Sequence, residues 1–515
     1  MGLARTQSVA LTGLDAHVVA VEADIAPGLP AVAWTGLPDT AVRQSSERVK
    51  AAVNNSGETW PSSRRITVGL SPASVRKSGS GFDLAVAVAV LAAAEALDRE
   101  AVRDLVLIGE LGLDGRVQPV TGVLPAVIGA VRHGADRVVV PRGNAREARL
   151  VPGLQVTAVG SLAELCAVLR GEWVDVAEPD EPEPAVARPE PDMADVVGQE
   201  PARFAVEVAA AGGHHLYLQG PPGVGKTMLA ERLPGLLPDL DEQSALEVTS
   251  IHSLLGKLER GRPLLTRPPY CAPHHSATMA SLVGGGAGIA RPGVISLAHC
   301  GVLFLDEAAE FSRQALDSLR QPLEAGVVTL SRVAGVATYP ARFLLVIAAN
   351  PCPCGRADTA DAASCSCTAN QLRLYRDKLS GPLRDRLDVR ARLAPISRSI
   401  LTAGAGGEPT AVVRARVEAA RERARHRLRG TPWSSNAELP GPVLRRDWPA
   451  PAAATRQLQI DLDRGRLSNR AVDRVMKVAW TVADLAGHDR PDVNDVAAAR
   501  SLRYGCDVDT LAQSA

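Results

Sequence analysis

Short apolar runs recur through the middle of the chain, each followed by polar or glycine-rich residues. Three of them, Leu216–Leu218, Gly301–Leu305 and Phe343–Ala349, have the length and composition of buried strands. Longer segments suited to helices lie between them. This order predicts an α/β fold in which helices cover both faces of an open parallel sheet, with the active edge at the carboxyl ends of the strands.

The first part of the chain mixes helix and strand less regularly. The pattern predicts strands at Leu105–Gly109 and Val138–Val140, a hairpin turn at Asp114–Gly115 and a helix at Val123–His133. These elements indicate an α+β domain. The longest apolar run, Leu84–Ala94, is shorter than the about 20 residues that cross a bilayer, so we expect no membrane span.

Two breaks in composition divide the chain. Ala177–Asp192 holds five prolines and six acids among sixteen residues, which predicts a stiff linker without a packed core. A weaker break, Thr402–Thr410, is rich in glycine and small residues. Beyond it, Ala411–Gly430 carries seven arginines and two glutamates, a composition typical of a solvated helical face. The predicted divisions are an α+β domain at 1–175, a linker at 176–192, an α/β core at 193–395 and a helical domain at 396–515.

Charge and composition narrow the class of protein. The 515 residues include 57 Lys and Arg against 57 Asp and Glu, a formal net charge of zero. This balance argues against a uniformly basic nucleic-acid binder and leaves local basic patches open. The 46% hydrophobic content is typical of a globular protein. The amino terminus lacks the apolar core of a secretory signal, so we expect a cytoplasmic protein.

Candidate chemistry begins directly after the first apolar run. Residues 220–227 form the full pattern G-x-x-x-x-G-K-T, and a predicted helix follows at Met228–Leu233. Backbone amides of such a loop converge on phosphate oxygens at a helix amino terminus. We expect Lys226 to reach the β- and γ-phosphates of ATP and Thr227 to ligate Mg²⁺. The predicted nucleotide-binding residues here are Gly220, Pro221, Pro222, Gly223, Val224, Gly225, Lys226 and Thr227.

Polar side chains also follow the other two apolar runs. Asp306 would hold Mg²⁺ through its water shell, and Glu307 would orient and deprotonate the attacking water. Asn350 would hold that water and sense the γ-phosphate. Taken alone, the acids also suit a helix amino terminus, and Asn350 suits a turn. Their position beside a phosphate loop favours the catalytic interpretation.

Four of the eight cysteines lie within sixteen residues, which indicates a local site rather than a disulfide framework. Cys352, Cys354, Cys365 and Cys367 form two C-x-C pairs and predict a structural Zn²⁺ site, with free thiols or an iron–sulfur cluster as alternatives. The usual zinc spacing is C-x-x-C, so the pattern departs from it. We interpret His274 and His275 as polar members of the core. The remaining cysteines, Cys166, Cys271, Cys300 and Cys506, are interpreted as small buried hydrophobic residues.

Part of the first domain resembles the Lon protease carboxy-terminal (S5-type) domain. The resemblance is carried by Arg76–Leu91 and Gly109–Pro141. Where the protease pattern has its nucleophilic serine and catalytic lysine, this chain has Gly81 and Ala126. Because neither side chain supplies a hydroxyl or an amine, the resemblance implies a Lon-like domain without proteolytic activity.

The span from Val196 to Val389 resembles the AAA+ ATPases of the magnesium-chelatase-like group, in particular the ComM/YifB family. The resemblance is carried by the phosphate loop and by DVVGQ at 195–199, APHHSAT at 272–278, LVGGG at 282–286, ISLAHCGVLFLDEAAEF at 295–311 and LSGPLRDRLDV at 379–389. A Lon-like domain ahead of this motor is that family's layout. The resemblance implies an ATP-hydrolysing ring, of six subunits as in relatives, with a helical carboxy-terminal lid.

Several residue roles follow from this resemblance alone. Val197, Gly198 and Gln199 would lie against the adenine. Arg386 resembles the arginine finger that one subunit supplies to its neighbour, with Arg384 as the alternative. Arg470 resembles the second sensor of the lid and would touch the γ-phosphate of its own subunit.

The function that the resemblance implies is a motor acting on branched or single-stranded DNA, a helicase or translocase that drives branch migration of recombination intermediates during competence. Two insertions would point into the ring pore, where Arg291 and Arg332 would contact phosphates; ordinary surface loops are the alternative. Other hypotheses are a magnesium-chelatase motor that drives metal insertion into a porphyrin, a Lon-like protease, and a scaffold without activity. Gly81 and Ala126 disfavour the protease, and the intact phosphate machinery disfavours the scaffold.

Overall fold

The computed structural model describes residues 2–173, 190–259, 262–286, 290–332, 335–357, 365–396 and 406–504. The predicted linker therefore lies outside the described residues except for 190–192, and so does Cys506. Within the described residues, no helix combines the length and the apolar composition needed to span a bilayer.

The amino-terminal part is built on a seven-stranded mixed sheet with the order β3-β4-β2-β1-β5-β8-β9. Its strands are β1 (Gly2–Thr12), β2 (Asp15–Ala26), β3 (Ala31–Thr35), β4 (Arg65–Ser71), β5 (Val106–Leu107), β8 (Arg137–Pro141) and β9 (Gln155–Val159). Its helices are α1 (Thr40–Asn55), α2 (Asp83–Ala93), α3 (Arg99–Val102), α4 (Val123–Arg132), α5 (Ala145–Ala148) and α6 (Leu162–Leu169). Most of the longest apolar run of the sequence lies in α2, and every residue of α2 is buried, because the helix is apolar on every face after its first residue, Asp83. The predicted turn at Asp114–Gly115 joins β6 (Glu110–Leu111) to β7 (Val117–Gln118).

The central part contains a five-stranded sheet with the order β11-β14-β17-β10-β18, in which every pairing is parallel. The strands are β10 (Leu216–Gln219), β11 (Tyr270–Cys271), β14 (Val302–Leu305), β17 (Leu344–Ala349) and β18 (Val389–Arg392). Helices cover both faces: Val302 and Phe304 pack into one apolar cluster, and Leu303 and Leu305 into another. The predicted parallel sheet is confirmed, and the carboxyl ends of its strands meet at one edge.

Helices and two hairpins surround this sheet. The helices are α7 (Glu200–Gly212), α8 (Lys226–Leu236), α9 (Glu242–Leu254), α10 (Met279–Val283), α11 (Val294–Leu297), α12 (Arg313–Asp317), α13 (Arg320–Ala325), α14 (Ala369–Lys378) and α15 (Gly381–Arg386). The hairpins are β12 (Gly284–Gly285) with β13 (Arg291–Pro292), and β15 (Val327–Arg332) with β16 (Gly335–Pro340). Five further helices follow: α17 (Thr410–Arg427), α18 (Gly441–Asp447), α19 (Ala452–Asp463), α20 (Asn469–Ala486) and α21 (Val493–Tyr504).

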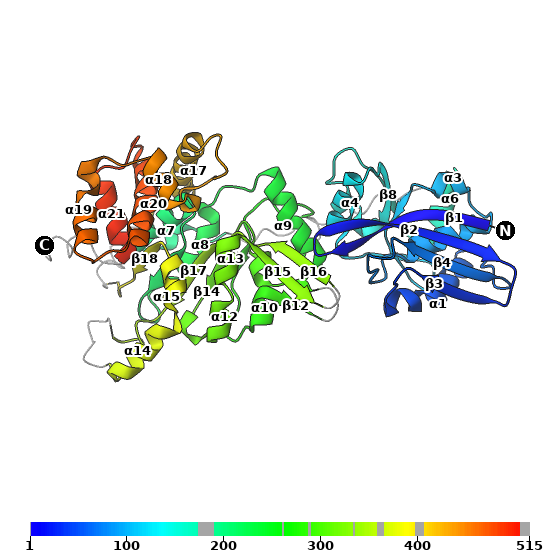
Figure 1. The fold of residues 1–515 in the computed structure, drawn as a ribbon, viewed down its shortest axis with the longest axis horizontal. Helices are drawn as coiled ribbons and strands as arrows, with labels where there is room; N and C mark the ends of the chain where they lie inside the picture. Colours follow the sequence, from blue (N-terminus) through cyan, green and yellow to red (C-terminus); the bar gives the residue numbers. More distant parts are fainter. Residues whose placement is uncertain are drawn as a thin grey trace.

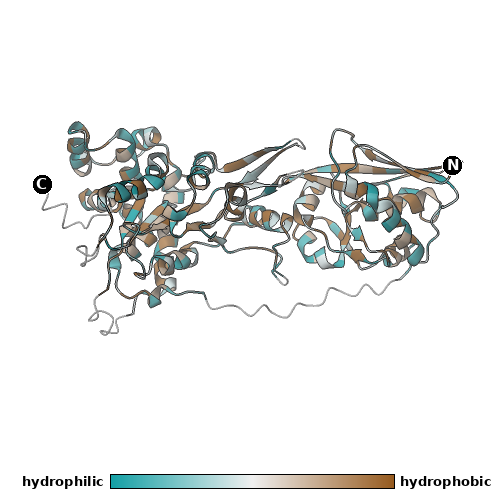
Figure 2. Cartoon of the chain, turned by 90° about the horizontal axis from the view of Figure 1, so that it is seen from below, coloured by the Kyte–Doolittle hydropathy of each residue, from teal (hydrophilic) through white to brown (hydrophobic). Residues whose placement is uncertain are grey.

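The amino-terminal part packs against α9 and the β15–β16 hairpin (Figure 1). Leu14, at the turn between β1 and β2, joins the apolar cluster that includes Leu330 and Ala337 of the hairpin. The amide of Gly122 donates to the carbonyl of Ser253 at 3.1 Å, and the Ser253 hydroxyl donates to buried Glu147. Apolar residues, brown in Figure 2, follow the strands in both parts. The two parts therefore contact each other through apolar and polar groups.

Candidate nucleotide site

The phosphate loop joins β10 to α8. A Cβ atom on Gly220 would lie 2.6 Å from the Leu393 carbonyl oxygen, so only glycine fits there. Gly225, with φ of 96°, precedes α8, and no side chain caps the amides of the first turn. These amides and the positive end of the helix dipole form a site for phosphate oxygens.

Lys226 and Asn350 meet within this loop. The Nζ of Lys226 donates to the carbonyls of Gly220 and Pro221, each at 2.8 Å, and to Oδ1 of Asn350 at 3.0 Å. Burial lowers the pKa of Lys226, while the nearby acidic side chains work against that shift. The predicted cation and the predicted sensor amide therefore lie in direct contact.

The predicted magnesium ligands also lie together. The hydroxyl of Thr227 donates to Oδ2 of Asp306 at 2.7 Å. Asp306 accepts a second hydrogen bond, of 2.9 Å, from the amide of Glu307. A hydroxyl beside a carboxylate is the hard-oxygen donor set that Mg²⁺ takes together with water and nucleotide phosphates. The residues present therefore fit Mg²⁺ with a nucleotide, which would supply charge neutralisation at the phosphates.

Glu307 follows Asp306 directly in the sequence, and its side chain is exposed to solvent. Its backbone adopts a left-handed conformation with φ of 48°, and 57% of its side chain is exposed. Oε2 lies 3.5 Å from Nδ1 of His275. The prediction that His274 and His275 belong to the core is wrong, because His274 is exposed and 38% of the His275 side chain is exposed. Both histidines lie beside the nucleotide site because their segment follows β11, the strand paired with β14.

The segment at 197–199 is tied to the phosphate loop. Gln199 has φ of 59°, and its Nε2 donates to the carbonyl of Ala394 at 2.7 Å and to that of Val224 at 3.3 Å. Gly198 also has a positive φ, of 66°, and Val197 is half-buried. These contacts hold the residues expected at the adenine against the loop that would hold the phosphates.

Arg386 lies at the opposite end of the sheet from the phosphate loop. It ends α15, and the amide of Asp388 donates to the carbonyl of His215, just before β10, at 3.0 Å. The four residues of β10 span about 13 Å and separate this point from Gly220. Arg386 pairs with Glu324 and donates to the carbonyl of Pro382 at 2.7 Å. Arg386 therefore lies away from the phosphate loop of its own chain.

Arg470 lies near Arg386. Burial lowers the pKa of Arg386, and the charges of Arg474, Arg320 and Arg470 lower it further. Arg474 follows Arg470 by one turn of α20 and pairs with Asp388. The expected contact of Arg470 with the γ-phosphate of its own subunit stays a prediction; its position near Arg386 makes the nucleotide of a neighbouring subunit the alternative.

Sequence reasoning missed the buried group around Asp388. Burial acts to raise the pKa of Asp388, but the contact with His214 and the charge of Arg474 outweigh it and hold the pKa below its usual range. Nδ1 of His214 lies 3.5 Å from Asp388, and its Nε2 is 2.8 Å from the Thr481 hydroxyl of α20. This group joins the segment with Arg386 to α20. The sequence signal that could have pointed to this group is Asp388 itself, an acidic residue two positions after the candidate arginine finger Arg386.

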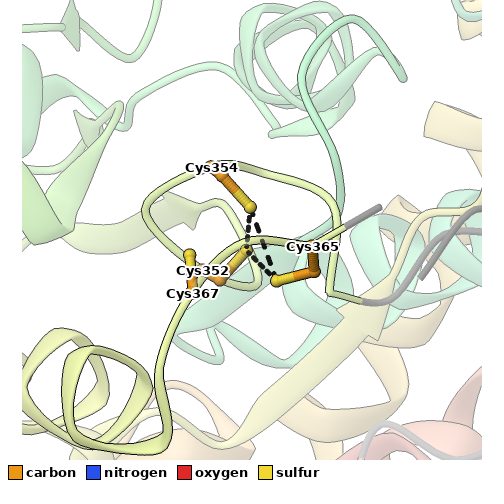
Figure 3. Close-up of side chains that lie close together, drawn as sticks. All are labelled: Cys352, Cys354, Cys365 and Cys367. Carbon is orange, nitrogen blue, oxygen red and sulfur yellow. Dashed lines mark hydrogen bonds between the residues drawn. The ribbon is translucent and has the colours of Figure 1, made fainter. Parts of the chain in front are cut away.

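The four clustered cysteines converge next to the phosphate loop. The Sγ atoms of Cys352 and Cys354 are 3.3 Å apart, those of Cys354 and Cys365 are 3.5 Å apart, and those of Cys352 and Cys365 are 3.9 Å apart (Figure 3). Cys367 lies within the same 4.8 Å group. A tetrahedral zinc with Zn–S bonds of about 2.3 Å requires sulfur atoms about 3.8 Å apart. The cluster therefore has the dimensions of a zinc site.

The cysteine loop contacts the phosphate loop at a glycine. A Cβ atom on Gly355 would lie 2.6 Å from Cδ of Pro222, and Gly355 has φ of 78°. The loop also follows Asn350 directly in sequence. A metal that fixes this loop would therefore fix the surroundings of both Pro222 and Asn350.

The two arginines expected at DNA lie on neighbouring hairpins. Arg291 belongs to β13 and Arg332 ends β15, and both are exposed. The hairpins are joined by a hydrogen bond of 2.6 Å from the Tyr339 hydroxyl to the Ala290 carbonyl. The structure thus brings together two basic residues that are 41 positions apart in the sequence.

The arginine-rich helix α17 differs from the expected solvated face. Arg416 pairs with Glu207 and Glu408, Arg427 pairs with Asp484, and Arg421 donates to the carbonyl of Ala210. These contacts join α17 to α7 and α20. These arginines of α17 therefore stabilise the packing of neighbouring helices, and the arginine-rich composition of α17 gives little support to DNA binding.

The residues at the expected protease positions lack the required chemistry. A Cβ atom on Gly81 would meet nothing within 4 Å, and Ala126 is buried in α4. Nearby Ser80 donates to Glu110, and buried Lys77 donates to the carbonyls of Gly36 and Pro72. None of these described residues forms a serine–lysine pair.

Family models and curated relatives agree with this geometry. The model "Magnesium chelatase, subunit ChlI" matches residues 192–401, "Subunit ChlI of Mg-chelatase" matches 21–144, and "Magnesium chelatase, subunit ChlI C-terminal" matches 407–503. An uncharacterised protein of Mycobacterium tuberculosis H37Rv is 54% identical over 98% of this chain and 99% of its own. YifB of Escherichia coli K12 is 40% identical over 95% and 94%, and the competence protein ComM of Haemophilus influenzae is 38% identical over 95% of each chain.

The chain belongs to the magnesium-chelatase-like ComM/YifB family. This membership supports ATPase activity and the use of ATP and Mg²⁺. The Lon protease of Azospirillum brasilense is 25% identical over 36% of this chain, a partial similarity in the amino-terminal region. The resemblances to the ComM/YifB family and to Lon are thus both confirmed.

Proposed function

We propose that this ComM/YifB-family protein is an ATP-driven ring motor that acts on DNA and promotes branch migration of recombination intermediates. The observation that supports the proposal is the separation of Arg386 from the phosphate loop of its own subunit. As an arginine finger, Arg386 would then act at the site of a neighbouring subunit, in a ring of six subunits. The paired hairpins with Arg291 and Arg332 supply cations for a phosphate backbone. Work on DNA in a bacterial cell would place the protein in the cytoplasm.

In this mechanism Lys226 and the loop amides bind the β- and γ-phosphates, while Thr227 and Asp306 hold Mg²⁺. Glu307 accepts a proton from the attacking water, and Asn350 orients that water. Val197, Gly198 and Gln199 would contact the adenine. The cation of Arg386 would stabilise negative charge on the phosphoryl group in the neighbouring subunit.

DNA is expected to raise the rate of ATP hydrolysis. Phosphate release should increase severalfold when forked or single-stranded DNA is added to the wild type, and Lys226→Ala should release little phosphate with or without DNA. The double variant Arg291→Ala/Arg332→Ala should lose most of the stimulation and need more DNA to reach it. Turnover of the wild type that does not respond to any DNA structure would overturn the DNA role.

The competing function is a magnesium-chelatase motor that drives metal insertion into a porphyrin, as the family models' descriptions suggest. The full-length similarity to a competence protein favours DNA. Stimulation of ATP hydrolysis by a porphyrin-binding partner, without any response to DNA, would reverse this choice.

We propose a structural zinc at Cys352, Cys354, Cys365 and Cys367. Purified protein should contain about one zinc per chain, as four thiolates of a closed site require. Cys352→Ser should lose the metal and lower ATP turnover, because the loop that contacts Pro222 is released. Elemental analysis and phosphate release measure the two effects. The control Cys300→Ser, outside the cluster, should keep both; iron in place of zinc, or a metal-free wild type, would contradict the proposal.

A further inference from the structure

The β15–β16 hairpin needs support from its surroundings. It is a sheet of only two strands, and such a hairpin is marginally stable until it packs against other parts. Leu330 and Ala337 form the buried pair nearest its tip among the described residues. Arg332 is exposed two residues beyond Leu330, about 7 Å along the strand. The position of Arg332 therefore depends on what packs against this buried pair.

The amino-terminal part contacts the hairpin at this pair. A Cβ atom on Gly13 would lie 3.4 Å from Cβ of Ala337 and 3.5 Å from the carbonyl oxygen of Thr338. Leu14, which is half-buried, packs against the cluster that includes Leu330. Gly13 and Leu14 form the turn between β1 and β2, which pair along the whole length of β1 (Figure 1). The turn is thus a firm support for the hairpin, because a long ladder inside a seven-stranded sheet holds it.

A second contact extends through α9 toward the β12–β13 hairpin. Leu246 of α9 packs against the amino-terminal core, and the hydroxyl of Ser253 donates to buried Glu147. In the same helix, Nε2 of His252 lies 3.1 Å from the carbonyl oxygen of Leu297 in α11. Because α11 follows β13 after one residue, α9 lies between the amino-terminal part and the segment that carries the second hairpin.

The two hairpins also contact each other at the supported pair. A Cβ atom on Gly284 of β12 would lie 2.9 Å from Cδ1 of Leu330. A Cβ atom on Gly285 would lie 3.4 Å from a guanidinium nitrogen of Arg332. A shift of Leu330 would therefore change the position of both hairpins.

We propose that the amino-terminal part positions both arginine-bearing hairpins for contact with DNA, through Leu14 at β15–β16 and through the Ser253–Glu147 contact at α9. This role rests on the proposed function, because it concerns the DNA contacts of Arg291 and Arg332. The contacting residues lie outside the nucleotide site, so they affect the response to DNA and leave ATP turnover without DNA unchanged.

Leu14→Ser is expected to loosen the hairpin and weaken DNA binding. The amides of residues 327–340 should exchange with deuterium severalfold faster in the absence of DNA. The Kd for a fluorescently labelled forked DNA should rise about fivefold, an effect typical of residues that couple sites through packing. ATP turnover without DNA should stay within about twofold of the wild type. The control Leu29→Ser changes a leucine that is 88% exposed at the other end of β2 and should match the wild type in all three measurements.

Ser253→Ala tests the second contact with a smaller change. Loss of its hydroxyl should raise the Kd for the same DNA about twofold to threefold without a change in ATP turnover. Unchanged hairpin exchange in Leu14→Ser, or an unchanged DNA Kd in both variants, would overturn the proposal.

A variant without the hairpin cations separates positioning from direct DNA contact by the amino-terminal part. On the Arg291→Ala/Arg332→Ala background, Leu14→Ser should change the DNA Kd by less than about twofold, because residues that act through one another are not additive. Additive losses would mean that the amino-terminal part affects DNA by another route and would overturn the role. A wild type that binds no DNA would instead refute the proposed function, while hairpin exchange would still report the support.

Discussion

Glu307→Gln is expected to stop ATP turnover while nucleotide binding is retained. Glutamine has the same shape as glutamate but does not accept the proton of the attacking water, and a general base contributes about 10²–10⁴-fold to a rate. The magnesium ligands Thr227 and Asp306 hydrogen-bond each other without the Glu307 side chain. Phosphate release should therefore fall by at least about 100-fold, while a fluorescent ATP analogue binds with nearly the wild-type Kd.

A nearby acid provides the control for this variant. Glu310 is exposed three residues further on and lies 3.6 Å from Lys378. Glu310→Gln removes the same charge from the same region and should leave turnover within about twofold, as is usual for an exposed ion pair. If Glu307→Gln kept more than a tenth of the wild-type rate, another group would have to be the base.

The local parts of the fold and site could be predicted from the sequence. The phosphate loop, the strand before it and the helix after it are contiguous, so their geometry depends on neighbouring residues. The apolar runs at β14 and β17 predicted strands for the same reason. Because parallel strands end at one edge, the closeness of Lys226, Asp306 and Asn350 followed from their positions after three such strands.

Contacts between distant segments could not be predicted in this way. The apolar pattern does not specify the order in which strands pair, so nothing placed β11 next to β14 or His275 next to Glu307. The His pair was assigned to the core because two adjacent histidines do not easily face one metal ion together, and the sequence did not show which strand lies beside them. The arginines of α17 were assigned to solvent because their acidic partners, such as Glu207 and Asp484, lie on other helices.

The role of Arg470 also depends on a contact between distant segments that the sequence does not show. Family resemblance identified a residue type on a helix and assigned it to its own subunit's nucleotide. The placement of α20 depends on Arg474 pairing with Asp388, which lies 86 residues earlier. This contact brings Arg470 near Arg386, so the subunit that each arginine serves becomes a question for experiment.

Arg386→Ala is expected to lower ATP turnover by about 10³-fold or more, the effect of removing an arginine finger. The guanidinium pairs with Glu324 in its own subunit and would leave that partner for the phosphoryl group of a neighbour. Phosphate release at saturating ATP measures the loss, and nucleotide affinity should change little. Arg384→Ala, two residues away and exposed, is the matched control; a larger loss for Arg384→Ala would make Arg384 the finger.

Mixing two inactive variants shows which subunit receives the arginine. A ring that contains both Arg386→Ala and Glu307→Gln chains has interfaces where an intact Glu307 faces an intact Arg386, so turnover should reappear if the finger serves the neighbour. If Arg470 also serves the neighbouring subunit, Arg470→Ala mixed with Glu307→Gln should recover turnover in the same way. If Arg470 instead touched its own subunit's nucleotide, no site would hold both intact residues and that mixture would stay inactive. The absence of recovery with Arg386→Ala would contradict the shared site.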